Sequence, residues 1–201
     1  MPNDILPVMR PRRGHFLYES GHHGDQWFDL EVLCLRPLAL QPFISRLAIM
    51  VSGHDPQVIC GPLVEGAYVG LLVANELGCE FVYALREASG LKQQASGELF
   101  PIQYRLPEPL HAAVRGKRVV IVNDMINAGS AVRATYLHLK ELGAKVSVVA
   151  CLMTRGDGFN LFAEEHKLKL ETLSRFPANL WTPEECPLCK QGERLEDLAK
   201  A

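Results

Sequence analysis

Long hydrophobic runs and an excess of either charge are both missing from this sequence. No apolar stretch approaches the ~20 residues that a transmembrane helix needs, and the residues from Met1 to Asp4 do not begin a signal peptide. The 21 basic and 23 acidic residues give a formal net charge of −2. This balance offers no electrostatic footprint for nucleic acid or an anionic membrane. We therefore expect neither a nucleic-acid nor a membrane partner.

The cysteine pattern argues against a disulfide scaffold. Six cysteines occur in 201 residues, and most of them lie in apolar surroundings. These are Cys34, Cys60, Cys79 and Cys151. A chain of this length builds a core without staples, so one domain in a reducing cytoplasm is the expectation. The hydrophobic content of 48% and the charged content of 22% are ordinary for a globular protein.

The most informative stretch runs from Arg118 to Val132. Its apolar residues Val119 to Val122 are too few for a helix and suit a strand buried on both faces of a parallel sheet. Asn123 and Asp124 follow where that strand should end, and residues 125–129 form a short turn with glycine. An amphipathic helix then begins, and Gly143 ends it.

A strand, a glycine turn and a helix together form a natural anion site. Several backbone amides and a helix N-terminus converge there, outside the carboxyl end of the strand. A phosphate on the turn would leave the Asp124 carboxylate one sugar-width away, where it can accept hydrogen bonds from two vicinal hydroxyls. The pattern suggests a ribose 5-phosphate held at both ends. An ordinary βα turn of a doubly wound fold is the alternative.

Further strand–helix units surround this one. A helix is expected from Pro37 to Ser52, with Pro42 in its first turn. The residues before it form an arm (1–14) and two extended pieces (16–19 and 26–29) around a turn rich in Gly and His. Later units are a strand at 58–60, a turn at 61–66, a helix at 67–77, strands at 80–85 and 145–152, a helix at 159–166 and a strand at 168–173. This order predicts an α/β fold with a mainly parallel twisted sheet and helices on both faces.

The run at 118–131 resembles the PRPP-binding signature of type I phosphoribosyltransferases. Its Ala-Gly-Ser-Ala ending (128–131), together with the segment 16–28, is most similar to the orotate phosphoribosyltransferase branch. The resemblance implies that fold with a small N-terminal hood. It divides the chain into an arm and hood (1–36), a PRPP-binding core (37–176) and a tail (177–201).

The resemblance also implies an activity and a set of site residues. The reaction would be transfer of the 5-phosphoribosyl group from PRPP to orotate or a related base, in pyrimidine biosynthesis, by a cytoplasmic homodimer. Mg²⁺ would be carried by PRPP rather than by protein ligands. The implied PRPP-binding residues are Asn123, Asp124, Ile126, Asn127, Ala128, Gly129, Ser130, Ala131, Val64, Glu65 and Gly66. The implied catalytic residues are Asp124, Arg86 and Lys92, and the base would meet Arg155 and Phe28.

Four residues depart from the family pattern. Asn123 replaces the first acidic residue, Asn127 replaces a threonine, Glu19 stands where a lysine is frequent, and Glu65 stands where a small residue is usual. Two hypotheses follow: an active transferase, or a PRPP-sensing regulator that has lost catalysis. Simpler interpretations also stay open. Arg155 could be a surface residue that caps the end of a strand, and residues 86–98 could be a solvated loop whose charges have no function.

The tail holds a Cys-x-x-C pair, Cys186 and Cys189, which is half of a zinc site. A second such pair is missing, and no histidine near it in the sequence is well spaced. Metal binding by His15, His22 and His23 is conceivable, but a polar hairpin tip is the favoured interpretation. Structural packing or an adventitious metal is therefore the expected use of the two cysteines, with a zinc or redox module as a third hypothesis.

Overall fold

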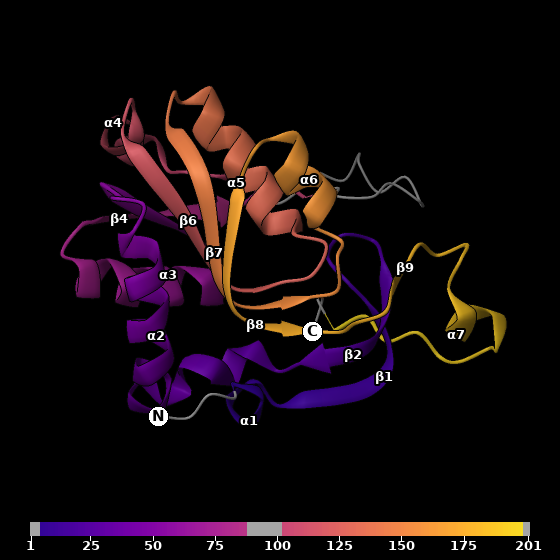
Figure 1. The fold of residues 1–201 in the computed structure, drawn as a ribbon. Coiled ribbons are helices and arrows are strands. Elements are labelled where there is room, and N and C mark those ends of the chain that lie inside the picture. The colour runs from indigo at the N-terminus through magenta and orange to yellow at the C-terminus, as the bar shows by residue number, and fades with distance from the viewer. Residues whose placement is uncertain (1–4, 88–101, 199–201) are drawn as a thin grey trace.

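The computed structural model describes residues 5–87 and 102–198, which form two sheets and the helices around them (Figure 1). The strands are β1 (Pro11–Leu17), β2 (His23–Phe28), β3 (Val58–Pro62), β4 (Glu80–Arg86), β5 (Tyr104–Arg105), β6 (Arg118–Ile126), β7 (Lys145–Arg155), β8 (Lys169–Phe176) and β9 (Leu180–Trp181). The helices are α1 (Leu6–Met9), α2 (Pro37–Ser52), α3 (Glu65–Leu77), α4 (His111–Val114), α5 (Ser130–Glu141), α6 (Asn160–Glu165) and α7 (Pro187–Lys190), with 3₁₀ turns η1 (Leu30–Leu35) and η2 (Glu108–Leu110). No helix in this described part is long and apolar enough to cross a membrane.

The large sheet has the order β5-β4-β3-β6-β7-β8. All its neighbouring strands pair in parallel except β5, which pairs antiparallel with β4 at one edge. The strand order reverses between β3 and β6, because the chain runs from β3 outward to β4 and then returns to β6. A crevice opens outside the carboxyl ends of the strands at such a switch point.

Helices cover both faces of this sheet, as predicted. One apolar layer joins α2 and α3 to the sheet and also takes in Phe28 and Leu33 from the N-terminal segment. The other joins α5 and α6 to the opposite face, through residues such as Tyr136 and Phe162. Because both faces are buried, β6 and β7 read as continuous apolar runs instead of alternating patterns.

The N-terminal residues form more regular structure than the expected arm. Helix α1 and strand β1 occupy residues 6–17, and β1 pairs with β2 as an antiparallel hairpin. Strand β9 adds to the other edge of β2, so that the tail completes a three-stranded sheet. We call residues 11–28 the hood. The arm expectation failed because the exposed residues at the start of β1 carry no alternating pattern of their own.

Helix α2 spans Pro37–Ser52 as predicted, but Pro42 lies inside the helix and not in its first turn, and it removes only the hydrogen bond that its missing N–H would make to Leu38. Other boundaries differ from the prediction: α3 begins at Glu65, β7 runs to Arg155 and β8 runs to Phe176. Strand β6 runs on to Ile126, because its ladder with β7 continues to the pair Ile126 and Thr154. Asn123 and Asp124 are therefore strand residues, and the turn after them is shorter than expected.

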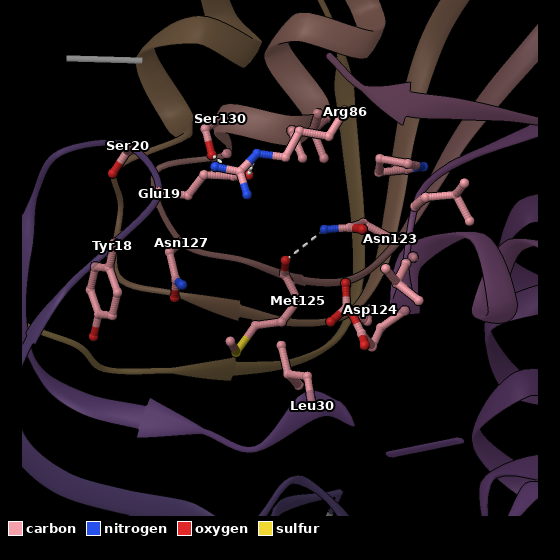
Figure 2. Close-up of a pocket in the computed structure, with 18 of the residues that line it drawn as sticks. Tyr18, Glu19, Ser20, Leu30, Arg86, Asn123, Asp124, Met125, Asn127 and Ser130 are labelled. Carbon is pink, nitrogen blue, oxygen red and sulfur yellow. Dashed lines mark hydrogen bonds and ion pairs between the residues drawn. The ribbon is translucent and has the colours of Figure 1, made fainter. Parts of the chain in front are cut away.

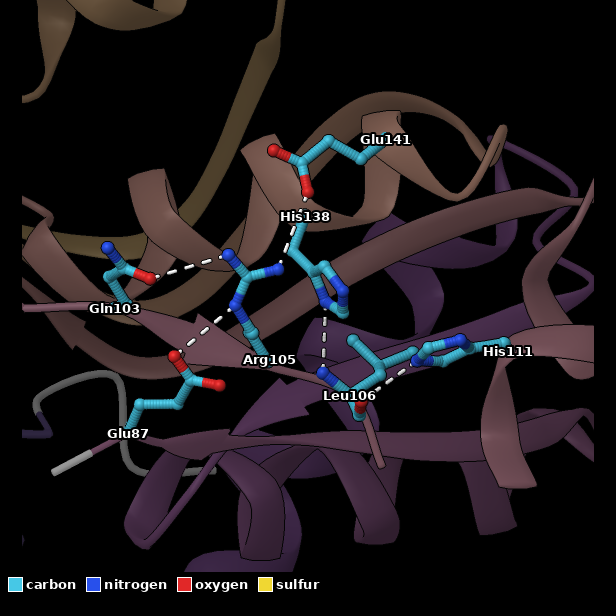
Figure 3. A network of polar contacts seen from close by, with 7 residues as sticks. All are labelled: Glu87, Gln103, Arg105, Leu106, His111, His138 and Glu141. Carbon is cyan, nitrogen blue, oxygen red and sulfur yellow. Dashed lines mark hydrogen bonds and ion pairs between the residues drawn. The ribbon is translucent and has the colours of Figure 1, made fainter. Parts of the chain in front are cut away.

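A polar network holds β5 beside the core (Figure 3). Arg105 contacts Glu87 and Glu141 at 3.3 and 3.6 Å, and the backbone N–H of Leu106 donates to Nδ1 of His138 at 3.0 Å. The amide of Glu87 also donates to the carbonyl of Gln103 at 2.9 Å. These contacts anchor β5 to α5 and to the residue that follows β4.

Candidate active site

A pocket of about 580 Å³ lies at the switch point, between the carboxyl ends of β3, β4 and β6 and under the hood (Figure 2). Its volume is in the range of small-molecule sites. The 61–66 turn forms one wall, residues 123–132 form the floor and a second wall, and the hood residues Tyr18 to Ser20 close it from above.

Asp124 is the most perturbed acid of the site. Its side chain is 5% exposed, and burial raises the pKa of Asp124 to about 7, with the nearby carboxylates of Glu65 and Glu31 adding to the rise. The backbone amides of Met125 and Asp124 oppose this shift. Burial also raises the pKa of Glu65. An acid held near neutrality in a cleft is typical of a functional site.

The turn between β6 and α5 has the form expected of an anion site. Gly129 has φ +78°, and a Cβ there would lie 2.4 Å from the Phe159 ring, so that glycine suits this point both in conformation and in space. Arg133 donates to the carbonyls of Ala128 and Gly158 at 2.7 and 2.6 Å, which braces the turn from behind. The first amides of α5 have no partner within the helix, and residues 128–132 line the pocket.

The turn after β3 is fitted to the end of β6. Gly66 lies in the first turn of α3, and a Cβ on it would come within 2.0 Å of Oδ1 of Asn123. The Asn123 amide is fixed in turn, because its Nδ2 donates to the carbonyl of Met125 at 2.7 Å. Close packing between Gly66 and Asn123 therefore joins the two walls. The peptide between Leu63 and Val64 is cis.

Glu19 projects from the hood into the pocket. Its carboxylate accepts hydrogen bonds from Ser130 Oγ at 2.8 Å and Tyr104 Oη at 3.1 Å, and it lies 3.4 Å from Nε of Arg86 (Figure 2). Burial raises the pKa of Tyr104, and the Glu19 carboxylate adds to the rise. Ser130 begins α5 and Arg86 ends β4, so this carboxylate bridges the start of α5 and the end of β4.

The charge of the lining favours a ligand that brings cations with it. Among the described residues of the wall, the charged ones are Glu19, Glu31, Glu65, Asp124 and Arg86. A bare polyphosphate would be repelled by four carboxylates. A polyphosphate that carries Mg²⁺ on its own oxygens fits better, because the ion adds positive charge beside the acids. The donor set thus agrees with Mg²⁺ carried by the substrate.

Most of the expected site residues meet in this pocket. Those that line it are Phe28, Val64, Glu65, Gly66, Arg86, Asn123, Asp124, Asn127, Ala128, Gly129, Ser130 and Ala131. Ile126 is buried and does not line it. Lys92 lies outside the described residues.

Arg155 is placed differently from the expectation that it faces the crevice directly. It is 1% exposed and is not among the described residues of the wall. Its Nη1 donates to Tyr18 Oη and Asn127 Oδ1 at 3.0 and 3.3 Å, and the guanidinium packs 4.8 Å from the centre of the Phe28 ring. Through these contacts Arg155 lies behind Tyr18, Asn127 and Phe28, which line the pocket. Its Nε and Nη2 find no hydrogen-bond acceptor in the described part of the chain.

Several lining residues were not predicted from the sequence. They come from the hood, η1 and the β4–β5 edge: Tyr18, Ser20, Trp27, Leu30, Glu31, Leu85 and Tyr104. The polar hairpin was recognised, and its turn residues were the available signal. Its docking over β6 depends on tertiary contacts such as that between Glu19 and Ser130, which no local pattern encodes.

The fold and the position of the pocket define the class of type I phosphoribosyltransferases. The crystal structure of orotate phosphoribosyltransferase from Aeropyrum pernix shares this fold with a TM-score of 0.63 at 19% identity, over 86% of this chain and 94% of that one. Adenine phosphoribosyltransferase from Thermoanaerobacter pseudethanolicus does so with a TM-score of 0.64 at 22% identity, over 86% and 98%.

The sequence itself carries the same relationship. Residues 44–168 match the model of the phosphoribosyl transferase domain, and the chain belongs to this family. An orotate phosphoribosyltransferase from Caldanaerobacter subterraneus subsp. tengcongensis is 27% identical over 180 residues, which cover 90% of this chain and 85% of the relative. The expectation of a phosphoribosyltransferase, and hence of a pentosyltransferase, is confirmed, as is the resemblance to the orotate branch.

Proposed function

We propose that this protein transfers the 5-phosphoribosyl group from PRPP to a ring nitrogen of orotate or a related base, with release of pyrophosphate. The observation that carries the proposal is the convergence of Asp124, the 127–131 turn and the 61–66 turn on one pocket at the switch point of the sheet. A ribose with a phosphate group at each end needs two anion-binding turns with a hydrogen-bond acceptor between them, and these three elements supply that set.

In this proposal each wall of the pocket holds one part of PRPP. The amides of the 127–131 turn and the hydroxyl of Ser130 bind the 5-phosphate, where the dipole of α5 also favours negative charge. The ionised Asp124 accepts hydrogen bonds from the two ribose hydroxyls. The 61–66 turn and Arg86 bind pyrophosphate. Lys92, from the segment between β4 and β5, is proposed to join them.

Catalysis follows from placement and electrostatics. As the bond from the anomeric carbon to pyrophosphate breaks, positive charge grows on the ribose ring and negative charge on the leaving group. The Asp124 carboxylate faces the positive charge on the ribose, and the guanidinium of Arg86 faces the negative charge on pyrophosphate. When bound with PRPP, Mg²⁺ supplies charge neutralisation to the phosphates. The hood above the pocket excludes water from the cationic ribose.

The base is proposed to enter beneath the hood, beside Phe28. Arg155 lies directly behind the Phe28 ring and carries two donors without a protein acceptor among the described residues. A buried guanidinium with spare donors favours an anionic base, because a carboxylate satisfies a guanidinium through paired hydrogen bonds. Glu19, near the opposite wall, contacts Arg86 and leaves Arg155 to serve this role.

An assay of pyrophosphate release tests the proposal. The full chain is incubated with PRPP, Mg²⁺ and each of orotate, uracil, adenine, guanine and hypoxanthine, and the nucleotide product is identified by mass. We expect turnover with orotate or a related base. Asp124→Asn should lower kcat by about 10²–10³ through loss of one preorganised charge. Asp55→Asn is the matched control, because Asp55 is a surface residue at φ +49°, which asparagine also adopts. No pyrophosphate release with any base would overturn the proposal.

A second candidate is a PRPP-binding regulator with little or no catalysis. The contact between Glu19 and Ser130 favours it, since a carboxylate already occupies part of the phosphate site. Asn123 adds to this, because an amide brings no charge to a cationic transition state. Calorimetry separates the two functions: a regulator binds PRPP with Mg²⁺ but releases no pyrophosphate with any base of the panel.

A homodimer is also part of the proposal. Large apolar side chains are exposed on two neighbouring helices, Leu38 and Ile49 on α2 and Tyr68 and Leu71 on α3, with exposed fractions between 47 and 89%. These side chains on α2 and α3 are the surface that we propose a second copy of the chain covers. Light scattering coupled to gel filtration should give twice the chain mass of 22.3 kDa. Ile49→Lys should shift the protein toward the monomer, and a monomeric wild type would contradict the dimer.

A further inference from the structure

Four side chains of types that can ligate a metal meet at the end of the hood, and none of them lines the pocket. His15 comes from β1 and His23 from β2. Cys186 directly precedes α7, and Cys189 is the third residue of that helix. One ligand atom of each lies within 4.8 Å of the other three. Figure 1 shows α7 and the tail beside the end of the β1–β2 hairpin. The sequence spacing alone had suggested no histidine for this cysteine pair.

The separations agree with a tetrahedral ion at the centre. Nε2 of His15 lies 3.2 Å from Nδ1 of His23, 3.4 Å from Sγ of Cys186 and 3.8 Å from Sγ of Cys189, and the last sulfur lies 3.2 Å from His23 Nδ1. Zinc bonds of about 2.0–2.3 Å at tetrahedral angles place ligand atoms roughly 3.3–3.8 Å apart. The four groups are thus already close to the required arrangement.

The hydrogen-bond roles of His15 point to the same conclusion. Its Nδ1 lies 3.0 Å from the carbonyl of Glu193, which only accepts, so Nδ1 is the donor there and Nε2 is the ring atom available to a metal. A single lone pair cannot satisfy the three polar atoms around it. A cation at the centre satisfies all four. A carbonyl behind the ring is also the usual support of a metal-binding histidine.

Burial makes this a closed site. His15, His23 and Cys186 are buried, with exposed fractions of 2, 5 and 0%, and Cys189 is exposed at the surface. Four protein ligands leave no open coordination position, which is the character of a structural site. His22 is not part of the cluster, and its Nδ1 lies 3.0 Å from the hydroxyl of Ser20.

We propose that His15, His23, Cys186 and Cys189 bind one Zn²⁺ that ties the C-terminal tail to the hood. Two thiolates and two imidazoles in tetrahedral positions select zinc among the common divalent ions. The two histidines lie on either side of Tyr18, Glu19 and Ser20, which close the substrate pocket. The ion therefore holds the hairpin tip in place. This site is independent of the proposed reaction, because no ligand of the ion lines the pocket.

Metal analysis of the full chain tests the proposal. Protein produced without a histidine tag in zinc-supplemented medium should contain about one zinc per chain by plasma mass spectrometry. The double variant Cys186→Ser/Cys189→Ser should retain less than about a tenth of that, and His15→Ala should also lose most of it. Cys79→Ser is the control, since Cys79 is a half-buried cysteine after α3, and its zinc content should stay unchanged.

Two measurements on the wild type keep the test independent of variant folding. Chelation of zinc should lower the unfolding midpoint by at least about 5 °C, and added Zn²⁺ should restore it. Co²⁺ in its place should give the visible absorption of a tetrahedral ion with thiolate ligands. Hydrogen exchange should rise in 14–24 and 180–197 on chelation. Zinc-free protein that binds no Co²⁺, a metal content unchanged in the double variant, or a disulfide between Cys186 and Cys189 in the freshly purified chain would each overturn the proposal.

Discussion

The hydroxyl of Ser130 donates a 2.8 Å hydrogen bond to the carboxylate of Glu19, so the hood places a negative charge at the first residue of α5. Helix N-termini favour anions, and this carboxylate satisfies that preference from within the chain. If this turn binds the 5-phosphate, as proposed, that phosphate has to displace the Glu19 carboxylate, and Glu19 would then compete with PRPP.

Replacing Glu19 by glutamine should tighten PRPP binding. The variant removes the charge but keeps the size and one acceptor, so we expect the Kd for PRPP with Mg²⁺ to fall about tenfold by calorimetry. Glu87→Gln is the matched control, because Glu87 is exposed, follows Arg86 directly in the sequence and pairs with Arg105. An unchanged or weaker affinity for Glu19→Gln would show that the carboxylate does not compete with the substrate.

The stability of the free protein should fall with rising pH because of Asp124. Its pKa is about 7 in the folded protein and about 3.9 in an unfolded chain. Between these values the unfolded state has lost the proton that the folded state keeps, so stability present below about pH 4 is lost as the pH rises through 7. The loss is on the order of a few kcal/mol.

Asp124→Asn removes this titration and is the test. Urea unfolding at pH 5, 6, 7 and 8 should show the variant gaining stability relative to wild type as the pH rises, with the largest difference at pH 8. A constant difference across the series would mean that Asp124 titrates at an ordinary pKa. Asp55→Asn, at the surface, should follow the wild type throughout.

Restoring an acid at position 123 should raise the rate at a cost in stability. Asn123→Asp places a second carboxylate beside the cationic ribose, and we expect kcat to increase by about 10-fold or more. The same change removes the donor to the Met125 carbonyl and buries another charge next to Asp124, so the free energy of unfolding should drop by about 1–3 kcal/mol. Asn75→Asp, on the exposed side of α3, should change neither. A stable variant with unchanged kcat would contradict the electrostatic role.

Gly66 should tolerate no side chain. A Cβ would meet Oδ1 of Asn123 at 2.0 Å, so Gly66→Ala must displace either the 61–66 turn or the Asn123 amide, which its hydrogen bond to the Met125 carbonyl holds in place. We expect a loss of about 1–3 kcal/mol in stability and weaker PRPP binding. Gly53→Ala is the control, because the nearest atom to its added Cβ is 3.6 Å away. Thermal unfolding and calorimetry report the two effects, and equal behaviour of the variants would refute the packing argument.

The core of the fold was predictable because its signals are local. The apolar run at Val119 to Val122, the glycine turn after it and the amphipathic α5 each show their structure within a few residues. The strand's extension to Ile126 was not, since it depends on pairing with β7.

The unpredicted parts of the site depend on contacts between distant segments. The raised pKa of Asp124 arises from burial and from Glu65 and Glu31, which lie far from it in sequence. The meeting of His15 with Cys186 spans 171 positions. Residue spacing along the chain predicts neither the raised pKa nor the contact between His15 and Cys186. The Cys-x-x-C pair itself could be recognised from the sequence.

The pairing of β9 with β2 has a consequence for synthesis on the ribosome. The amide of Leu17 donates to the carbonyl of Glu196, and β9 pairs with β2, so the hood is completed by segments that lie far from it in the sequence. At roughly 5–20 residues per second, the first strand waits on the order of ten seconds or more for its last neighbour. During that interval the nascent hairpin exposes an unpaired strand edge, which is a surface open to pairing with other chains.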